Sequence, residues 1–96
     1  MPTFQRTPRF ILDWRKLTDD MQAAFRRVVR DQFVPDLVRG KFRPQLRVKR
    51  VRGTSGVWEM TFGPDGRATF EYGDGRLGEA HIIWRRVGTH EIFRNP

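Results

Sequence analysis

The chain has 96 residues and lacks cysteine altogether, which excludes disulfides, thiol nucleophiles and zinc sites built on cysteine. It also lacks long hydrophobic runs, the longest being about three residues, and its first residues do not form the apolar segment of a signal peptide. Two histidines without cysteine are a poor ligand set, so we expect no metal and no cofactor. We therefore expect one cytoplasmic domain over residues 1–96, without contact to a membrane.

Acidic residues are scarce, since 11 Asp and Glu stand against 19 Lys and Arg and give a formal net charge of +8. Only three of the 19 cations are lysines, and arginine is the side chain suited to bidentate binding of phosphate or carboxylate groups. This balance indicates a polyanionic partner, either a nucleic acid or an acidic protein.

The basic segment, residues 39–52, is the densest run of charge and contains no acid. Its seven cations are Arg39, Lys41, Arg43, Arg47, Lys49, Arg50 and Arg52. They could follow a phosphate backbone, or they could only keep an exposed strand edge from aggregating. Seven cations without a compensating acid favour the phosphate interpretation.

Two helices are predicted in the first half of the chain. Thr7 is a capping residue followed by a proline, and apolar residues at helical spacing predict a helix from Pro8 to about Lys16. Thr18 begins a second helix, in which Pro35 is expected to end or kink the helix before a C-cap at Gly40. The apolar stripe of this second helix consists of Met21, Phe25, Val28, Val29 and Phe33.

The second half is predicted to form an antiparallel meander of four strands, because apolar and polar residues alternate there between glycine-rich turns. A short strand near Phe4 is expected to precede the helices. The four strands of the meander are expected at residues 46–48, 57–62, 67–72 and 80–87. The predicted fold class is therefore α+β: a short N-terminal strand, a two-helix hairpin and a four-strand antiparallel meander.

The hairpin between the second and third strands of the meander has a predicted register. A three-residue turn ending in a left-handed Gly66 pairs Phe62 with Ala68 and places Glu59 opposite Glu71. Two facing carboxylates destabilise a hairpin unless a cation bridges them, and Arg85 or Arg86 on the next strand is the candidate cation. The pair could also serve as a general acid and base, but a Glu–Arg ladder is the favoured interpretation.

His90 is the candidate for proton transfer. It follows the last predicted strand beside a glycine, where an imidazole can reach solvent and donate or accept a proton. His81 is expected to begin that strand and to have no chemical role.

Four segments resemble the RelE/ParE superfamily of bacterial type II toxins, in particular the RelE-like translation inhibitors. They are Phe42–Lys49, Gly56–Met60, Gly66–Tyr72 and His81–Phe93. The helical first half agrees with the superfamily in order and length. The resemblance therefore implies a RelE-like fold and a toxin that cleaves mRNA in the ribosomal A site, by attack of a ribose 2′-hydroxyl on the adjacent phosphate.

The resemblance also implies roles for individual residues. Arg67 matches an arginine that stabilises the transition state, His90 is assigned proton transfer or phosphate contact, and Phe93 would stack on a base. Some relatives carry lysines where this chain has Glu59 and Thr61, so the general base stays open between Glu59 and His90. The residues expected to bind the RNA are Arg47, Lys49, Arg50 and Arg85.

The resemblance implies three partners: a cognate acidic antitoxin, the ribosome and its mRNA. Two other functions stay open on the same fold. A ParE-like protein would inhibit DNA gyrase without nuclease residues, and a catalytically silent domain would bind RNA or ribosomes without cutting.

Overall fold

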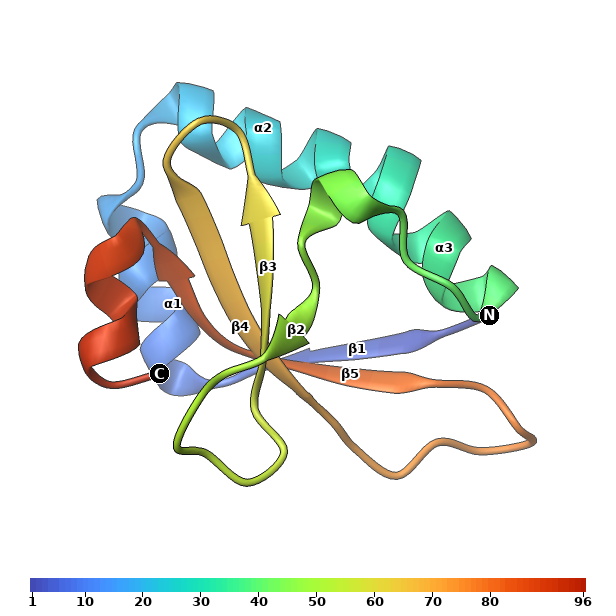
Figure 1. Cartoon of the computed structure of the whole chain (residues 1–96). Coiled ribbons are helices and arrows are strands. Elements are labelled where there is room, and N and C mark those ends of the chain that lie inside the picture. The colour runs from blue at the N-terminus through green and yellow to red at the C-terminus, as the bar shows by residue number, and fades with distance from the viewer.

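The computed structural model describes all residues from Met1 to Pro96, and Figure 1 shows the arrangement of their elements. The helical elements are α1 (Pro8–Lys16), α2 (Asp19–Val28), the π-helical η1 (Val29–Phe33), α3 (Val34–Arg39) and the 3₁₀ turns η2 (Pro44–Leu46) and η3 (His90–Arg94). The strands are β1 (Thr3–Arg6), β2 (Lys49–Arg50), β3 (Trp58–Phe62), β4 (Gly66–Tyr72) and β5 (His81–Gly88).

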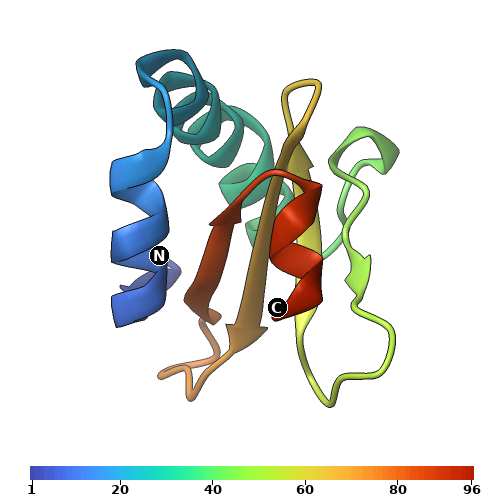
Figure 2. The same cartoon turned by 90° about the vertical axis from the view of Figure 1, so that its left-hand side faces the viewer.

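The strands form one mixed sheet in the order β1-β5-β4-β3-β2, in which β1 runs parallel to β5 and all other neighbours are antiparallel. The predicted α+β class, the leading strand and the antiparallel meander are confirmed. The helix α1 and the turn η3 lie on opposite sides of the sheet (Figure 2). None of the helices has the length and apolarity needed to cross a membrane.

The helix boundaries lie where the capping residues predict them. The hydroxyl of Thr7 accepts a hydrogen bond from the backbone N–H of Phe10, and Thr18 does the same for Met21. Gly40 ends α3 in the left-handed conformation, with φ +84°, which costs glycine little because it has no Cβ.

Pro35 neither ends nor breaks the second helix, because the chain takes a wider turn just before it. The segments α2, η1 and α3 follow one another without leaving helical backbone angles, and the N–H of Val34 donates to the carbonyl of Val29, five residues back. A proline cannot donate and its ring clashes with the preceding turn of a regular helix. The π turn relieves this conflict, and the helix continues to Gly40.

The core is aromatic and lies between the sheet and the helices. Phe25 of α2 makes edge contacts with Phe62 of β3 and Trp84 of β5, with ring centroids 5.2 Å apart in both pairs. Phe33 is fully buried and packs edge-on against Phe70 of β4 at 5.2 Å. Such pairs add about 0.5–1.5 kcal/mol each beyond the burial of their area.

The first strand of the meander begins later than predicted, because residues 46–48 do not form a strand. Pro44, whose φ is fixed, begins the turn η2 instead, and Arg47 takes a left-handed conformation with φ 50°. Leu46 reaches the core from this turn and is 1% exposed. The apolar alternation that suggested a strand is therefore satisfied by a short turn, and β2 is reduced to two residues.

The predicted register of the β3–β4 hairpin is also wrong, by two residues. Phe62 pairs with Gly66 instead of Ala68, so the loop consists of residues 63–65. Gly63, the first residue of the loop, is left-handed with φ +65°, whereas Gly66, which was expected to be left-handed, is not. Gly66 is required for another reason, since a Cβ there would collide with the carbonyl oxygen of Phe62. Because side chains alternate with a period of two, the slip leaves every residue on its predicted face.

Candidate functional site

The open face is our name for the side of the sheet that α1, α2 and α3 leave uncovered. Alternation along the strands places polar side chains on it. Its residues on β2, β3 and β4 are Lys49, Glu59, Thr61, Arg67, Thr69 and Glu71. The turn η3 packs over one part of this face against β4 and β5.

Arg67 and His90 lie at the same end of the open face. Arg67 of β4 pairs with Gly88, the last residue of β5, and His90 begins η3 two residues further on. Ile92 anchors η3, since it is 3% exposed and a Cβ on Gly88 would collide with its side chain. The absence of a side chain at Gly88 thus lets η3 turn back beside Arg67.

His90 is exposed and has an aromatic neighbour. Its ring meets that of Phe93 edge to face, with the centroids 5.1 Å apart, and Phe93 is half-buried. Arg67 is half-buried, and its guanidinium donates one hydrogen bond to the carbonyl of Gly66 at 2.8 Å. Neither side chain takes part in an ion pair, so both retain donors for a ligand.

Glu59 faces Thr69 and not Glu71, so the predicted carboxylate pair does not exist. On its other side Glu59 is paired with Lys49 of β2. It is also a diagonal neighbour of Arg67, at a separation of about 7–8 Å that long side chains can span. The structure therefore brings Lys49, Glu59 and Arg67 onto adjoining positions of one surface.

Arg85 and Arg86 have different structural roles. Arg85 donates to Glu71 at 2.8 Å, which confirms a Glu–Arg contact across the sheet. Arg86 donates instead to Asp13 of α1 at 2.6 Å, and the same carboxylate accepts the backbone N–H of Val87 at 3.2 Å. Asp13 is 6% exposed, so Arg86 belongs to the packing of α1 on β5. The register of β4 and β5 shifts between these two arginines, since Thr69 pairs with Arg86 and Phe70 with Trp84, which leaves Arg85 as the extra residue of a β-bulge.

One carboxylate, that of Asp36, contacts the basic segment in the folded chain. Asp36 lies three residues before it, and its carboxylate accepts hydrogen bonds from the backbone N–H and the guanidinium of Arg43 and from Arg39. The Arg43 guanidinium holds the pKa of Asp36 at about 2, below the ordinary 3.8, because its hydrogen bonds favour the charged form although burial opposes it. Two of the seven cations therefore stabilise the fold.

The three residues of the basic segment that are predicted to contact phosphate do not lie on one surface. Lys49 is on the open face beside Glu59, whereas the next residue, Arg50, turns its guanidinium over the ring of Trp58, 5.5 Å from the ring centroid. Arg47 is exposed on the left-handed residue after η2. Of the three, Lys49 alone adjoins Glu59 and Arg67 on the strands of the open face.

Sequence reasoning missed the residues that hold this face in place. Asp13 and Arg86 are 73 positions apart, and no local pattern links them. The hydroxyl of Thr69 is fully buried under the end of the chain and donates to the carbonyl of Pro96 at 3.2 Å. In the sequence Thr69 looks like the other polar residues of this face, so no local signal could have found its contact. No cluster of three or more histidine, aspartate or glutamate side chains is arranged to hold a metal ion.

Several solved toxin structures resemble this fold. The toxin–antitoxin complex RelBE2 from Mycobacterium tuberculosis matches with a TM-score of 0.63 at 20% identity, over 92% of this chain and 96% of that one. The YoeB/ParE toxin from Agrobacterium tumefaciens gives 0.66 at 14%, over 92% and 98%. YafQ from E. coli gives 0.64 at 13%, over 95% and 96%. No protein-family model and no curated protein sequence matches the chain.

These comparisons define the class of fold to which the chain belongs. The helix pair packed on a five-stranded mixed sheet is the fold of RelE-like toxins, and it extends over nearly the whole chain. At such low identity the likeness concerns the fold alone, so the activity has to be argued from the residues of the open face.

Proposed function

We propose that this protein is a RelE-like toxin that inhibits translation by ribosome-dependent cleavage of mRNA. The observation that supports the proposal is that Arg67 adjoins Glu59 and Lys49 on the open face, and that it pairs with Gly88, after which the chain turns into η3 with His90 and Phe93. An arginine, a titratable imidazole and an aromatic ring are the groups needed to hold a phosphate, move a proton and stack on a base.

The proposed reaction cleaves the RNA backbone by transesterification and does not require a metal. A base removes the proton of a ribose 2′-hydroxyl, and the oxygen attacks the adjacent phosphorus. The bond from phosphorus to the 5′-oxygen then breaks, and an acid delivers a proton to that oxygen. The products are a cyclic 2′,3′-phosphate and a free 5′-hydroxyl, so no oxidant or water molecule is consumed.

Arg67 is the group that we assign to the developing negative charge on the phosphate. Its guanidinium can donate hydrogen bonds to two phosphate oxygens at once. Because Arg67 belongs to strand β4, its backbone is held in place before the substrate binds. His90 is assigned to proton transfer, because an imidazole can both donate and accept a proton and this one is open to solvent. Glu59 is the second candidate base, and Phe93 has no hydroxyl and can only stack.

We propose two kinds of partner. The ribosome and its mRNA would meet the cations of the basic segment, chiefly Arg47, Lys49 and Arg50, with Arg85 at the edge of the site. RelB–RelE complexes from several organisms are described as antitoxin–toxin complexes, and a net charge of +8 suits an acidic antitoxin here as well.

The test separates cleavage from binding. Arg67→Ala and His90→Ala should each slow single-turnover cleavage of mRNA on ribosomes by about a hundredfold or more, since a preorganised charge contact or a proton-transfer group is worth about that factor. Ribosome affinity and melting temperature should change little. Arg76→Ala and His81→Ala are the matched controls, because both residues lie away from Arg67 and His90.

Full cleavage by both variants would contradict the assigned site. Induction of the wild-type chain in cells distinguishes mRNA cleavage from gyrase inhibition. New mRNA ends that map within codons would support the proposal. DNA-damage signalling with intact mRNA would instead indicate a gyrase inhibitor.

A further inference from the structure

The C-terminal segment, residues 89–96, carries both His90 and Phe93 and packs against β4 and β5 through η3, on the side of the sheet opposite α1 (Figure 2). Its side chains give it little anchorage, because Ile92 is the one buried residue of the segment. A single buried side chain fixes one point of a segment and not its direction. The orientation of the His90 ring therefore depends on what holds the backbone beyond Ile92.

Two neighbouring arginines of β5 hold the end of this segment. The Nη1 of Arg86 donates to the carbonyl oxygen of Asn95 at 2.9 Å, and the Nε of Arg85 donates to the carbonyl oxygen of Pro96 at 3.1 Å. The hydroxyl of Thr69 donates to the same oxygen of Pro96 at 3.2 Å. We call Arg85 and Arg86 the arginine clasp. All three donors reach backbone oxygens, so these contacts do not depend on the side chains at positions 95 and 96.

Each arginine of the clasp is itself held by a carboxylate. Arg86 donates through Nε and Nη2 to Asp13 of α1 at 2.6 and 3.3 Å, and Arg85 donates through Nη1 to Glu71 of β4 at 2.8 Å. A guanidinium is planar and rigid, so a carboxylate that binds some of its N–H groups also fixes the direction of the others. Two carboxylates, one of them on α1, thus aim the donors that hold the C-terminal segment. Two nitrogens of Arg85 are engaged within the chain, which gives this residue a role apart from any contact with RNA.

We propose that Arg85 and Arg86 are positioning residues, which hold the C-terminal segment on the sheet so that His90 and Phe93 meet the RNA in a fixed orientation. This inference rests on the proposed function, since His90 is the group assigned there to proton transfer. Such a group has to lie within hydrogen-bond reach of the atom it serves, and a displacement of about 1 Å can cost about a hundredfold in rate. The clasp supplies this precision through the backbone of the segment, without itself touching the substrate.

The two arginines differ in what else depends on them. The contact of Arg86 with Asp13 belongs to the packing of α1, and its loss would leave a carboxylate that is only 6% exposed without its partner. Arg85 and Glu71 are partly exposed, so the loss of Arg85 releases the segment and leaves the core intact. Substitution of Arg85, and deletion of residues 95 and 96, therefore test the clasp without breaking the buried ion pair.

The first measurement is made on the chain alone, without ribosomes, by ¹⁵N relaxation of the backbone amides. In the wild type, residues 90–94 should be as rigid as the strands, with order parameters of about 0.85. Deletion of residues 95 and 96 removes both acceptors of the clasp and should lower these values below about 0.6, and Arg85→Gln should lower them part of the way.

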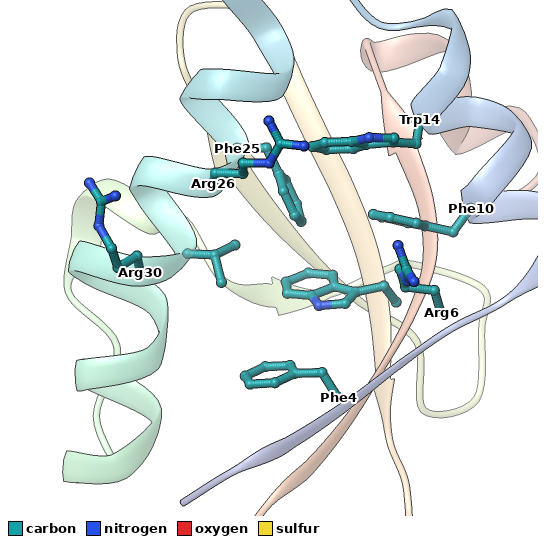
Figure 3. A pocket seen from close by; sticks show the side chains of 9 residues that line it. Phe4, Arg6, Phe10, Trp14, Phe25, Arg26 and Arg30 are labelled. Carbon is teal, nitrogen blue, oxygen red and sulfur yellow. The ribbon is translucent and has the colours of Figure 1, made fainter.

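The matched control for these variants is Arg6→Gln. It removes one charge beside the groove between β1, α1 and α2, on the helix-covered side of the sheet (Figure 3). Arg6 takes part in no ion pair and does not contact the C-terminal segment. Residues 90–94 should therefore stay rigid in this variant. Strand β4 should stay rigid in every variant, which shows that each of them folds.

The second measurement is single-turnover cleavage of mRNA at saturating ribosome concentration. The deletion and Arg85→Gln should each slow cleavage by about tenfold or more, with ribosome affinity little changed. Arg85→Lys separates positioning from phosphate contact, because lysine keeps the charge but cannot reproduce two directed donors, and it should be as slow as Arg85→Gln. In a His90→Ala background, Arg85→Gln should cause a much smaller further loss, because its effect acts through His90.

Three results would overturn the inference. Residues 90–94 that stay rigid in the deletion variant would mean that the clasp does not hold the segment. Wild-type cleavage by Arg85→Lys, beside an Arg85→Gln variant that binds ribosomes weakly, would make Arg85 a phosphate contact. A full further loss from Arg85→Gln in the His90→Ala background would place its role elsewhere. Failure of the wild type to cleave mRNA would instead contradict the proposed function, and the relaxation data would still decide whether the clasp holds the segment.

Discussion

The helix-covered face of the sheet and the open face consist of alternate residues of the same strands. Phe62 and Ala68 are buried among aromatic rings, while their neighbours Thr61 and Arg67 are half-exposed on the other side. The covered face is held by packing, and the open face by a few specific polar contacts, such as Arg85 with Glu71. The comparison teaches that the packed core residues and the proposed site residues are separated by a single step along a strand.

Neighbouring alanine substitutions should give the largest contrast between the faces. Phe62→Ala leaves a cavity beside Phe25 and should lower the free energy of unfolding by about 3–5 kcal/mol. Thr61→Ala, one residue away on the open face, should change it by less than about 0.5 kcal/mol. Urea unfolding of both variants measures the difference. Equal losses would mean that the open face is as tightly packed as the core.

Acid titration should reveal the charge contact between Asp36 of α3 and Arg43. The pKa of Asp36 is about 2 in the folded chain against an ordinary 3.8, so its contribution to stability is present above the higher value. It is lost as the pH falls from about 4 through 2, where the folded carboxylate takes up its proton. Asp36→Asn should therefore be less stable at neutral pH and should flatten the dependence of stability on pH between these values.

The control for Asp36 is Asp65→Asn in the exposed hairpin turn, which leaves the contacts with Arg43 intact. Urea unfolding at a series of pH values checks the prediction. An Asp36→Asn curve that is parallel to that of the wild type would remove Asp36 from the acid response.

The smallest effect is expected on the open face itself. Arg85 and Glu71 are each 37% exposed at the side chain, so solvent screens their ion pair. Glu71→Gln should lower the free energy of unfolding by only about 0.2–1 kcal/mol at low salt, and the difference should vanish near 1 M NaCl. Denaturation at the two salt concentrations measures it, and a loss that persists at high salt would contradict the screened pair.

Sequence patterns predicted the elements of the fold better than their partners. Thr7, Thr18 and Gly40 set their helix ends through local contacts, which a sequence displays directly. The hairpin register slipped because two glycines of one turn were both candidates for the left-handed position, and sequence does not say which is needed for close approach. The slip moved Glu59 from Glu71 to Thr69.

Sequence patterns could not predict contacts between residues that are far apart in the chain or joined only by its folding. Arg43 reads as a free cation until the chain folds back on Asp36, and Arg86 until α1 packs on β5. The candidate residues Arg67 and His90 belong to the same end of the β4–β5 pair, because Arg67 pairs with Gly88, two residues before His90. Their roles stay predictions, because a position on a face establishes neighbourhood and not chemistry.

The π turn at Val29–Phe33 has a consequence for the angular phase of the helix that follows it. Successive residues of an α-helix are rotated by about 100°, and a π turn amounts to one extra residue in the spiral. The face that α3 turns toward the η2 segment is thus set by this insertion. A regular helix over the same residues would rotate Asp36 away from Arg43 and leave a cation and a carboxylate unpaired. The number of residues in the π turn therefore determines which side of α3 packs against the rest of the protein.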